Sequence, residues 1–192
     1  MSGLATQHAP AALAEFQPFP SIARLNREWI ASEKIDGTNA LVYVDEEGHV
    51  RAGSRSKWIT RENDNFGFAR WVEANSNELT KLGPGYHYGE WWGSGIQRGY
   101  GLTEKRFSLF NSHRWSDDSV RPACCGVVPV LARGVKVGMV EDVAIVALQE
   151  LGSIVAPGFM RPEGIVLFHA ASGQLFKVTL EKDEQPKGQV RL

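Results

Sequence analysis

The feature that most constrains the fold is a series of short apolar segments, four to seven residues long, that are bounded by turn-forming residues. Segments of this length that are rich in β-branched and aromatic residues are typical of β-strands. Consecutive strands that are joined by tight turns pair in an antiparallel manner. The pattern therefore predicts an α+β fold with antiparallel sheets rather than a doubly wound parallel sheet. The predicted strands cover residues 29–32, 40–44, 49–54, 86–92, 106–111, 127–131, 163–169 and 175–180.

Two longer stretches have the spacing of amphipathic helices. Apolar residues recur on one face over residues 65–82, and a Gly-Pro pair ends this segment. A second predicted helix covers residues 140–151 and ends at a glycine. Pro129 interrupts one of the predicted strands, which indicates an edge strand or a bulge at that point.

Length and composition are those of a globular protein with a proper core. The chain has 192 residues, of which 43% are hydrophobic and 22% are charged, so it can bury a sizeable apolar core. We expect a loosely ordered segment over residues 1–18, followed by one folded domain over residues 19–192. The two cysteines, Cys124 and Cys125, are neighbours, and this arrangement suits neither a disulfide framework nor a zinc site.

The same features bear on where the protein acts. No apolar run approaches the roughly 20 residues of a membrane-spanning helix, and the first residues do not form a secretory signal. We therefore expect a cytoplasmic monomer that does not enter a membrane. The formal net charge of −1 excludes a protein that is coated with basic residues.

Positive charge is nevertheless concentrated in one short stretch. Residues 51–61 contain no acidic side chain. Their charges are compatible with a solvated strand face and also with a groove that binds nucleic-acid phosphates. A glycine-rich stretch over residues 93–101 adds Arg98 as a further candidate contact. The candidate nucleic-acid residues are Arg51, Arg55, Lys57, Arg61 and Arg98.

The most informative polar motif surrounds Lys34. This lysine ends a predicted strand and is followed by Ile35, Asp36 and Gly37. Strand alternation places Lys34 and Asp36 on one face and Ile35 on the other. A lysine next to a turn is commonly a plain surface residue. The alternative is an amine nucleophile that forms a covalent intermediate, which requires further groups around it.

Suitable partner groups occur along the rest of the chain. An amine that attacks a nucleotide phosphate needs cations, carboxylates and a flat apolar face for the base. Three of the candidates also have a structural interpretation: Glu90 as a partner of a surface arginine, Phe110 as a core residue, and Lys177 as a residue of an edge strand. One site explains all of them together. The candidates are Arg55, Lys57, Glu90, Phe110, Glu163 and Lys177.

In chain order, the segments EKIDG, SRSK, GEWWG, FSLFN, PEGIV and FKV resemble the six motifs of covalent nucleotidyltransferases, which include ATP-dependent polynucleotide ligases and mRNA capping enzymes. The segment EKIDGTN is most similar to RNA-repair ligases of the RNA-ligase-2 type, which occur in phages. The resemblance extends from Phe19 to Lys177. It implies an ATP-grasp-like antiparallel-sheet domain with flanking helices, and an RNA ligase that uses ATP and Mg²⁺ or Mn²⁺.

The resemblance implies a role for each matching residue. Lys34 is the expected site of the AMP adduct. Glu33 is expected to read the adenine edge together with backbone atoms near Ile35, and Asn39 is expected to lie near the α-phosphate. Lys177 is expected to hold that phosphate.

The remaining motifs imply the other contacts. Arg55 is expected to contact the ribose or the incoming phosphate, Glu90 the ribose hydroxyls, and Phe110 the face of adenine. Glu163 is expected to position the metal ion through water. The implied nucleic-acid partner is RNA with 5′-phosphate and 3′-hydroxyl ends, either free or in a nicked duplex.

Three residues depart from the family pattern. The last motif usually has a second lysine where this chain has Thr179, although Lys182 is close enough in sequence to replace it. Tyr88 stands at a position where DNA ligases usually have Asp, and Asn111 at one where many relatives have Asp. Neither an OB-fold nor a helical C-terminal domain is expected within this length. Two alternatives stay open: a minimal ATP-dependent DNA ligase, and a catalytically idle nucleic-acid-binding relic.

Overall fold

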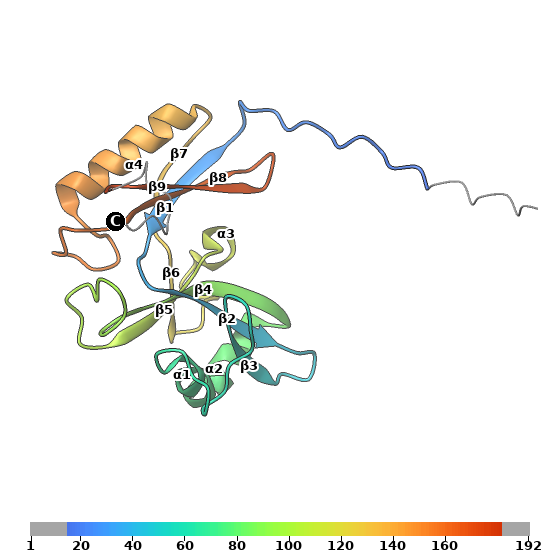
Figure 1. The fold of residues 1–192 in the computed structure, drawn as a ribbon, viewed down its shortest axis with the longest axis vertical. Helices are drawn as coiled ribbons and strands as arrows, with labels where there is room; N and C mark the ends of the chain where they lie inside the picture. Colours follow the sequence, from blue (N-terminus) through green and yellow to red (C-terminus); the bar gives the residue numbers. More distant parts are fainter. Residues whose placement is uncertain (1–14, 182–192) are drawn as a thin grey trace, which may run out of the picture.

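The computed structural model describes residues 15–181, which form two β-sheets with helices on their outer faces (Figure 1). The first sheet has four strands in the order β7-β1-β8-β9, and every neighbouring pair is antiparallel. Its strands are β1 (Trp29–Lys34), β7 (Val130–Gly134), β8 (Gly164–His169) and β9 (Gln174–Thr179).

The second sheet has five strands in the order β3-β2-β4-β5-β6. Three of its four pairs are antiparallel, and β5 pairs with β6 in parallel. The predicted α+β fold with antiparallel sheets is confirmed, with this one parallel pair as an addition. The strands are β2 (Thr38–Val44), β3 (Val50–Ser54), β4 (Gly85–Gly93), β5 (Lys105–Leu109) and β6 (Cys125–Val127).

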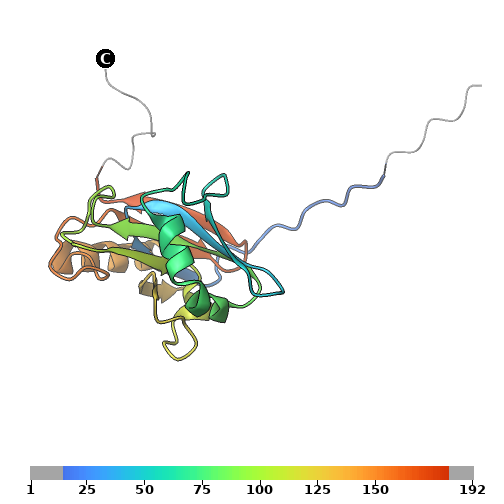
Figure 2. The same ribbon diagram turned by 90° about the horizontal axis from the view of Figure 1, so that it is seen from below.

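Helices cover the outer face of each sheet. Helix α4 (Val137–Leu151) packs Val140, Ala144 and Leu148 against the four-stranded sheet. Helices α1 (Phe68–Ala74) and α2 (Ser76–Leu79) cover the face of the five-stranded sheet that lies away from the four-stranded sheet, as Figure 2 also shows. The two remaining faces of the sheets point toward the middle of the molecule, and these faces carry the polar motifs.

The chain passes directly between the two sheets at two short crossovers. Residues 35–37 link β1 to β2, and residues 128–129 link β6 to β7. The two crossovers lie side by side, because the Glu33 amide donates a hydrogen bond of 3.0 Å to the Pro129 carbonyl. The predicted strand 127–131 is therefore wrong as a single element, because at Pro129 the chain leaves one sheet and enters the other. The edge position that Pro129 indicated is confirmed, since β6 and β7 are both edge strands.

The predicted helix over residues 65–82 is also wrong as a single element. It consists of α1, α2 and a 3₁₀ turn, η1 (Thr80–Leu82). The break falls at Asn75, whose backbone is non-helical (φ −110°, ψ 14°) and whose side-chain amide donates to the Trp71 carbonyl over 2.8 Å. Asparagine competes in this way with helical hydrogen bonds, and the apolar spacing alone does not reveal the break.

Smaller differences occur at the ends of elements. Helix α4 begins at Val137, three residues earlier than the predicted position. A short helix, α3 (Ser112–Trp115), was not predicted, and the Asn111 side chain caps it by accepting from the Arg114 amide over 3.0 Å. Most of the predicted N-terminal segment 1–18, and Lys182, lie outside the described residues. Within the described part of the chain, no helix is long and apolar enough to cross a membrane.

Candidate active site

Lys34 lies at the end of β1 on the sheet face that points away from α4. Alternation along the strand puts Trp29 and Ala31 into the core beneath α4 and leaves the Lys34 side chain on the opposite face. There its Nζ atom lies 2.5 Å from Oε2 of Glu163, which is 8% exposed. Glu163 directly precedes β8, and Gly164 pairs with Lys34 across the two strands. The sheet register therefore brings these two predicted residues together.

Glu33 points in the opposite direction from Lys34. Its side chain is 1% exposed and accepts hydrogen bonds from the Ser153 hydroxyl (2.6 Å) and from the amides of Ile154 (2.8 Å) and Val155 (3.2 Å). Burial raises the pKa of Glu33, and these hydrogen bonds oppose that rise. We therefore assign this carboxylate to holding the loop after α4, and its contact with adenine stays a prediction.

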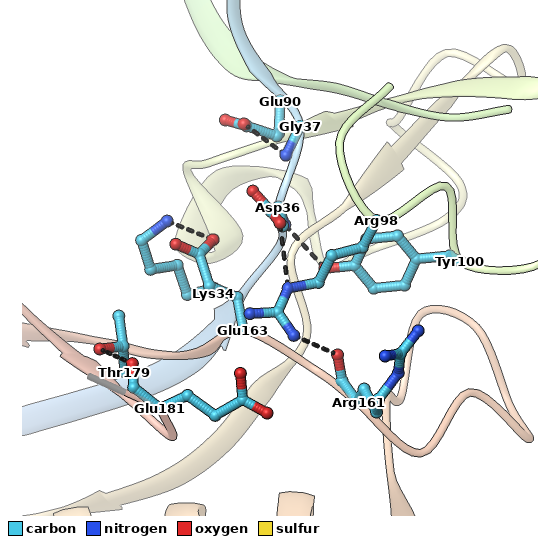
Figure 3. A network of polar contacts seen from close by, with 10 residues as sticks. All are labelled: Lys34, Asp36, Gly37, Glu90, Arg98, Tyr100, Arg161, Glu163, Thr179 and Glu181. Carbon is cyan, nitrogen blue, oxygen red and sulfur yellow. Dashed lines mark hydrogen bonds and ion pairs between the residues drawn. The ribbon is translucent and has the colours of Figure 1, made fainter. Parts of the chain in front are cut away.

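The crossover after Lys34 is held by side chains from one distant loop and from strand β4 (Figure 3). The Asp36 amide donates to the Tyr100 hydroxyl over 2.7 Å, and the Asp36 carboxylate accepts from Nε of Arg98 over 3.0 Å. The Gly37 amide donates to Oε1 of Glu90 over 3.1 Å. A Cβ atom on Gly37 would lie 2.5 Å from the Trp91 carbonyl oxygen, so the close approach requires glycine.

The loop over residues 94–101 supplies the clamp on this crossover. Tyr100 is 3% exposed and has a left-handed backbone conformation with φ 54°. Burial raises the pKa of its hydroxyl group, so Tyr100 stays protonated. Arg98 also donates to the Arg161 carbonyl over 3.0 Å. Sequence reasoning missed Tyr100, and the signal available was an aromatic residue among glycines in a polar loop.

Glu90 is the second buried carboxylate of the site. Burial raises the pKa of Glu90 to about 7, and the positive charge of Lys34 and the Gly37 amide oppose that rise. Its strand neighbours in the sheet are Asn39 and Ser108, so these three side chains lie in one row on the inner face. Glu90 therefore changes charge near neutral pH beside the amine of Lys34.

Replacing Glu90 with glutamine is expected to stabilise the protein at alkaline pH. An acid whose folded pKa is raised contributes stability below its unfolded pKa of about 4.5, and this contribution is lost as the pH rises through about 7. Gln cannot ionise, so the free energy of unfolding of Glu90→Gln should exceed that of wild type increasingly between pH 5 and pH 8. The difference should grow by up to about 3 kcal/mol, measured by urea denaturation. Glu104→Gln, at an exposed position, is the control, and a pH-independent difference would contradict the assignment.

Other predicted residues border this site. Lys177 lies on the Lys34 face of the four-stranded sheet, because it pairs with Val166, which in turn pairs with Ser32. Arg55 is exposed and directly follows β3, whose last residue, Ser54, pairs with Ala40 on β2. Phe110 follows β5, is 41% exposed, and donates from its amide to the Tyr88 carbonyl over 2.9 Å.

The predicted nucleic-acid contacts are only partly available. Nε of Arg61 lies 2.9 Å from the Glu73 carboxylate, and the Arg98 guanidinium is paired with Asp36. The Arg51 guanidinium lies 4.4 Å from the centre of the Trp58 ring. Lys57 is exposed. The side chain of Ile35 is buried in a core with Trp92, Tyr100, Val128 and Ala156, so only its backbone is available to a ligand.

A cavity next to the five-stranded sheet was not predicted. It measures about 500 Å³, and its walls include Trp92, Ser108, Pro129 and Val155. None of the predicted site residues lines it.

A separate group of possible metal ligands, Asp45, Glu47 and His49, lies in the turn between β2 and β3. There the Asp45 carboxylate accepts from the His49 amide, so it serves the turn.

The fold and the order of its motifs place the protein in the covalent nucleotidyltransferase superfamily. A sequence model of one family, described as RNA ligase, matches residues 27–179. The chain belongs to the RNA ligase family. No curated protein sequence matches it.

Solved structures with the same fold come from an RNA ligase of Naegleria gruberi. A mutant with ATP and Mn is 18% identical, with a TM-score of 0.57, over 80% of this chain and 49% of that chain. An apo mutant is 20% identical, with a TM-score of 0.58, over 81% and 50%. The structure with pyrophosphate is 20% identical, with a TM-score of 0.57, over 80% and 50%. The chain therefore spans about half the length of the Naegleria ligase.

Proposed function

We propose that the protein is an ATP-dependent RNA ligase that joins 5′-phosphate and 3′-hydroxyl ends through a lysyl-AMP intermediate. The observation that carries this proposal is the pair of Lys34 and Glu163, with the second buried carboxylate of Glu90 beside it. An amine and two carboxylates in a partly buried site suit nucleophilic attack on a nucleotide phosphate. The Naegleria gruberi ligase, with the same fold, has been determined with ATP and Mn and with pyrophosphate.

In the first step, Nζ of Lys34 attacks the α-phosphorus of ATP. A P–N bond forms, the bond to the bridging β-phosphate oxygen breaks, and pyrophosphate leaves with the bonding electrons. Lys34 must first release a proton, and the Glu163 carboxylate at 2.5 Å is positioned to accept it.

The surrounding residues hold the nucleotide. Lys177 and Arg55 offset charge on the phosphate oxygens. Asn39, which pairs with Glu90 across β2 and β4, lies near the α-phosphate. Glu90 accepts hydrogen bonds from the ribose hydroxyls, and Phe110 offers an exposed ring face to adenine.

A divalent cation fits this donor set. Carboxylate oxygens are the ligands that Mg²⁺ and Mn²⁺ prefer. Glu163 and Glu90 are both buried, and Glu163 contacts the amine of Lys34. Glu163 would hold the ion, directly or through water. The ion supplies charge neutralisation for the transferring phosphoryl group.

Two further steps complete ligation. AMP passes from Lys34 to the 5′-phosphate of one RNA end, which breaks the P–N bond and forms a 5′–5′ pyrophosphate linkage. The 3′-hydroxyl of the other end then attacks the activated 5′-phosphate and displaces AMP. The free amine of Lys34 is already restored in the second of the three steps, when the P–N bond breaks.

Sealing assays test the proposal against the DNA-ligase alternative. We expect a nick with RNA on its 3′-hydroxyl side to be sealed in the presence of ATP and Mg²⁺ or Mn²⁺, and an all-DNA nick to be sealed at least tenfold more slowly. The product is measured as the lengthened strand on a denaturing gel. Equal sealing of both nicks would favour a DNA ligase. A protein that is adenylylated by ATP but does not seal even a nick whose 5′-phosphate is already adenylylated would contradict ligation.

A further inference from the structure

Exposed aromatic side chains form a row on the inner face of the five-stranded sheet, and the proposed chemistry does not use them. We call Tyr43, Trp58, Tyr86 and Tyr88 the aromatic row. Trp58, Tyr86 and Tyr88 are 40%, 57% and 58% exposed, and Tyr43 is partly buried beneath them. A contiguous exposed apolar patch, unlike single scattered residues, is typical of an interaction site.

The rings contact one another in sequence. The centres of the Trp58 and Tyr43 rings are 5.8 Å apart, and those of Tyr43 and Tyr86 are 4.8 Å apart. The Tyr86 and Tyr88 rings are 6.4 Å apart with planes only 13° from parallel. The row is therefore one continuous surface built from β2, β4 and the segment after β3.

The aromatic row starts beside the candidate active site and leads away from it. Tyr88 and Tyr86 lie two and four residues before Glu90 on β4, on the same face of the sheet. Successive side chains on one face of a strand are about 7 Å apart. A small hollow of about 160 Å³ lies between Tyr86, Tyr88 and Phe110.

Positive charge accompanies the rings. The Arg51 guanidinium stacks on Trp58 at 4.4 Å, and Arg55 and Lys57 are exposed close by in sequence. Within residues 15–181, none of these three cations takes part in an ion pair. Unpaired cations beside exposed ring faces complement a ligand that has both phosphates and bases.

We propose that the aromatic row binds a single-stranded segment of the RNA substrate by stacking on its bases, next to the end that is joined. This inference rests on the proposed function. The bases of a duplex are already stacked on one another, whereas unpaired bases can be splayed onto separate rings. The phosphates of the same segment contact Arg51, Arg55 and Lys57.

The test measures binding of a 5′-phosphorylated, fluorescein-labelled RNA of about 12 nucleotides, within the range of strand lengths that such sites cover. ATP is left out. Tyr86→Ala and Trp58→Ala should each weaken binding about tenfold, because stacking of one base on an aromatic ring contributes on this scale. Tyr86→Phe keeps the ring and should change the affinity less than about twofold. Phe176→Ala, at an exposed aromatic residue on the other sheet, should bind as wild type.

A second RNA with abasic sites near its 5′ end separates stacking from other effects. On this probe, Tyr86→Ala and wild type should bind equally weakly. Wild-type affinity of Tyr86→Ala for the normal RNA would overturn the inference, as would an unchanged effect of Tyr86→Ala on the abasic RNA. The inference would also be overturned if a blunt RNA duplex bound as tightly as the single strand and was weakened equally by Tyr86→Ala. Thermal melting of each variant shows whether it is folded.

Covalent labelling by ATP needs no RNA and tests the proposed function separately. If Lys34 becomes labelled but RNA binding is independent of the aromatic row, only the present inference fails. If Lys34 is not labelled and RNA still binds through Tyr86, the ligase proposal fails and the aromatic row remains a single-strand binding surface.

Discussion

Replacing Lys34 with alanine is expected to abolish covalent labelling of the protein by α-labelled ATP in the presence of Mg²⁺ or Mn²⁺. The variant lacks the amine that forms the P–N bond. Lys34→Arg should be equally inactive, because a guanidinium stays protonated and is not a nucleophile. The label on wild type should be lost in acid and kept in alkali, as for a phosphoramidate, when it is followed on a denaturing gel.

The controls for this experiment use another lysine of the chain. Lys136→Ala removes an exposed amine at the start of α4, on the far side of the four-stranded sheet, and should be labelled at the wild-type rate. Labelling that persists in Lys34→Ala would show that another residue carries the nucleotide and would contradict the assigned nucleophile.

Glu163→Gln should have the second largest effect, with a rate of adenylylation at least about 100-fold below that of wild type. Gln has nearly the same shape but neither accepts a proton from Lys34 nor attracts a cation, and such proton transfers typically contribute 100-fold or more. The rate is measured in a single turnover with saturating ATP. Because the loss concerns proton transfer, raising the pH should partly restore the rate of Glu163→Gln.

Glu181→Gln is the matched control for this substitution. Glu181 is an exposed carboxylate just beyond β9, and its backbone carbonyl accepts from the Thr179 hydroxyl over 3.0 Å (Figure 3). It should be adenylylated as fast as wild type. A rate for Glu163→Gln within about threefold of wild type would mean that the carboxylate seen beside Lys34 has no part in the reaction.

The sequence predicted the strands well because they are short apolar runs that are bounded by turn-forming residues. The predicted segments 40–44 and 163–169 are of this kind, and except for Glu163 both lie within strands of the structure. The prediction of one helix over residues 65–82 failed because of a single polar residue. The Asn75 side chain donates a hydrogen bond to the Trp71 carbonyl, and the spacing of apolar residues does not reveal this contact. The prediction of one strand across Pro129 failed for a related reason. The sheet that a strand joins depends on partner strands far along the chain, and these partners differ before and after Pro129.

The candidate site was predicted where a residue acts through its own chemistry. Lys34 and Glu163 are 129 residues apart in sequence and adjacent in the structure. Residues that act by holding others were missed, including Tyr100 and Ser153. Their roles follow from the path of two loops. Tyr100 stands out in the sequence as an aromatic residue among glycines, but the sequence does not show which backbone amide or carboxylate a loop hydroxyl contacts.

The two crossovers between the sheets restrict how the molecule can open. With only three residues in one link and two in the other, the chain lacks the slack for the sheets to separate like two hinged domains. In the proposed reaction, a nucleotide must then enter and pyrophosphate must leave without separation of the sheets, and the loop over residues 94–101 is itself held in place by the buried side chains of Ile96 and Tyr100. Insertions are better tolerated in the hairpin turns at residues 45–48 and 170–173, where added length does not change the distance between the sheets.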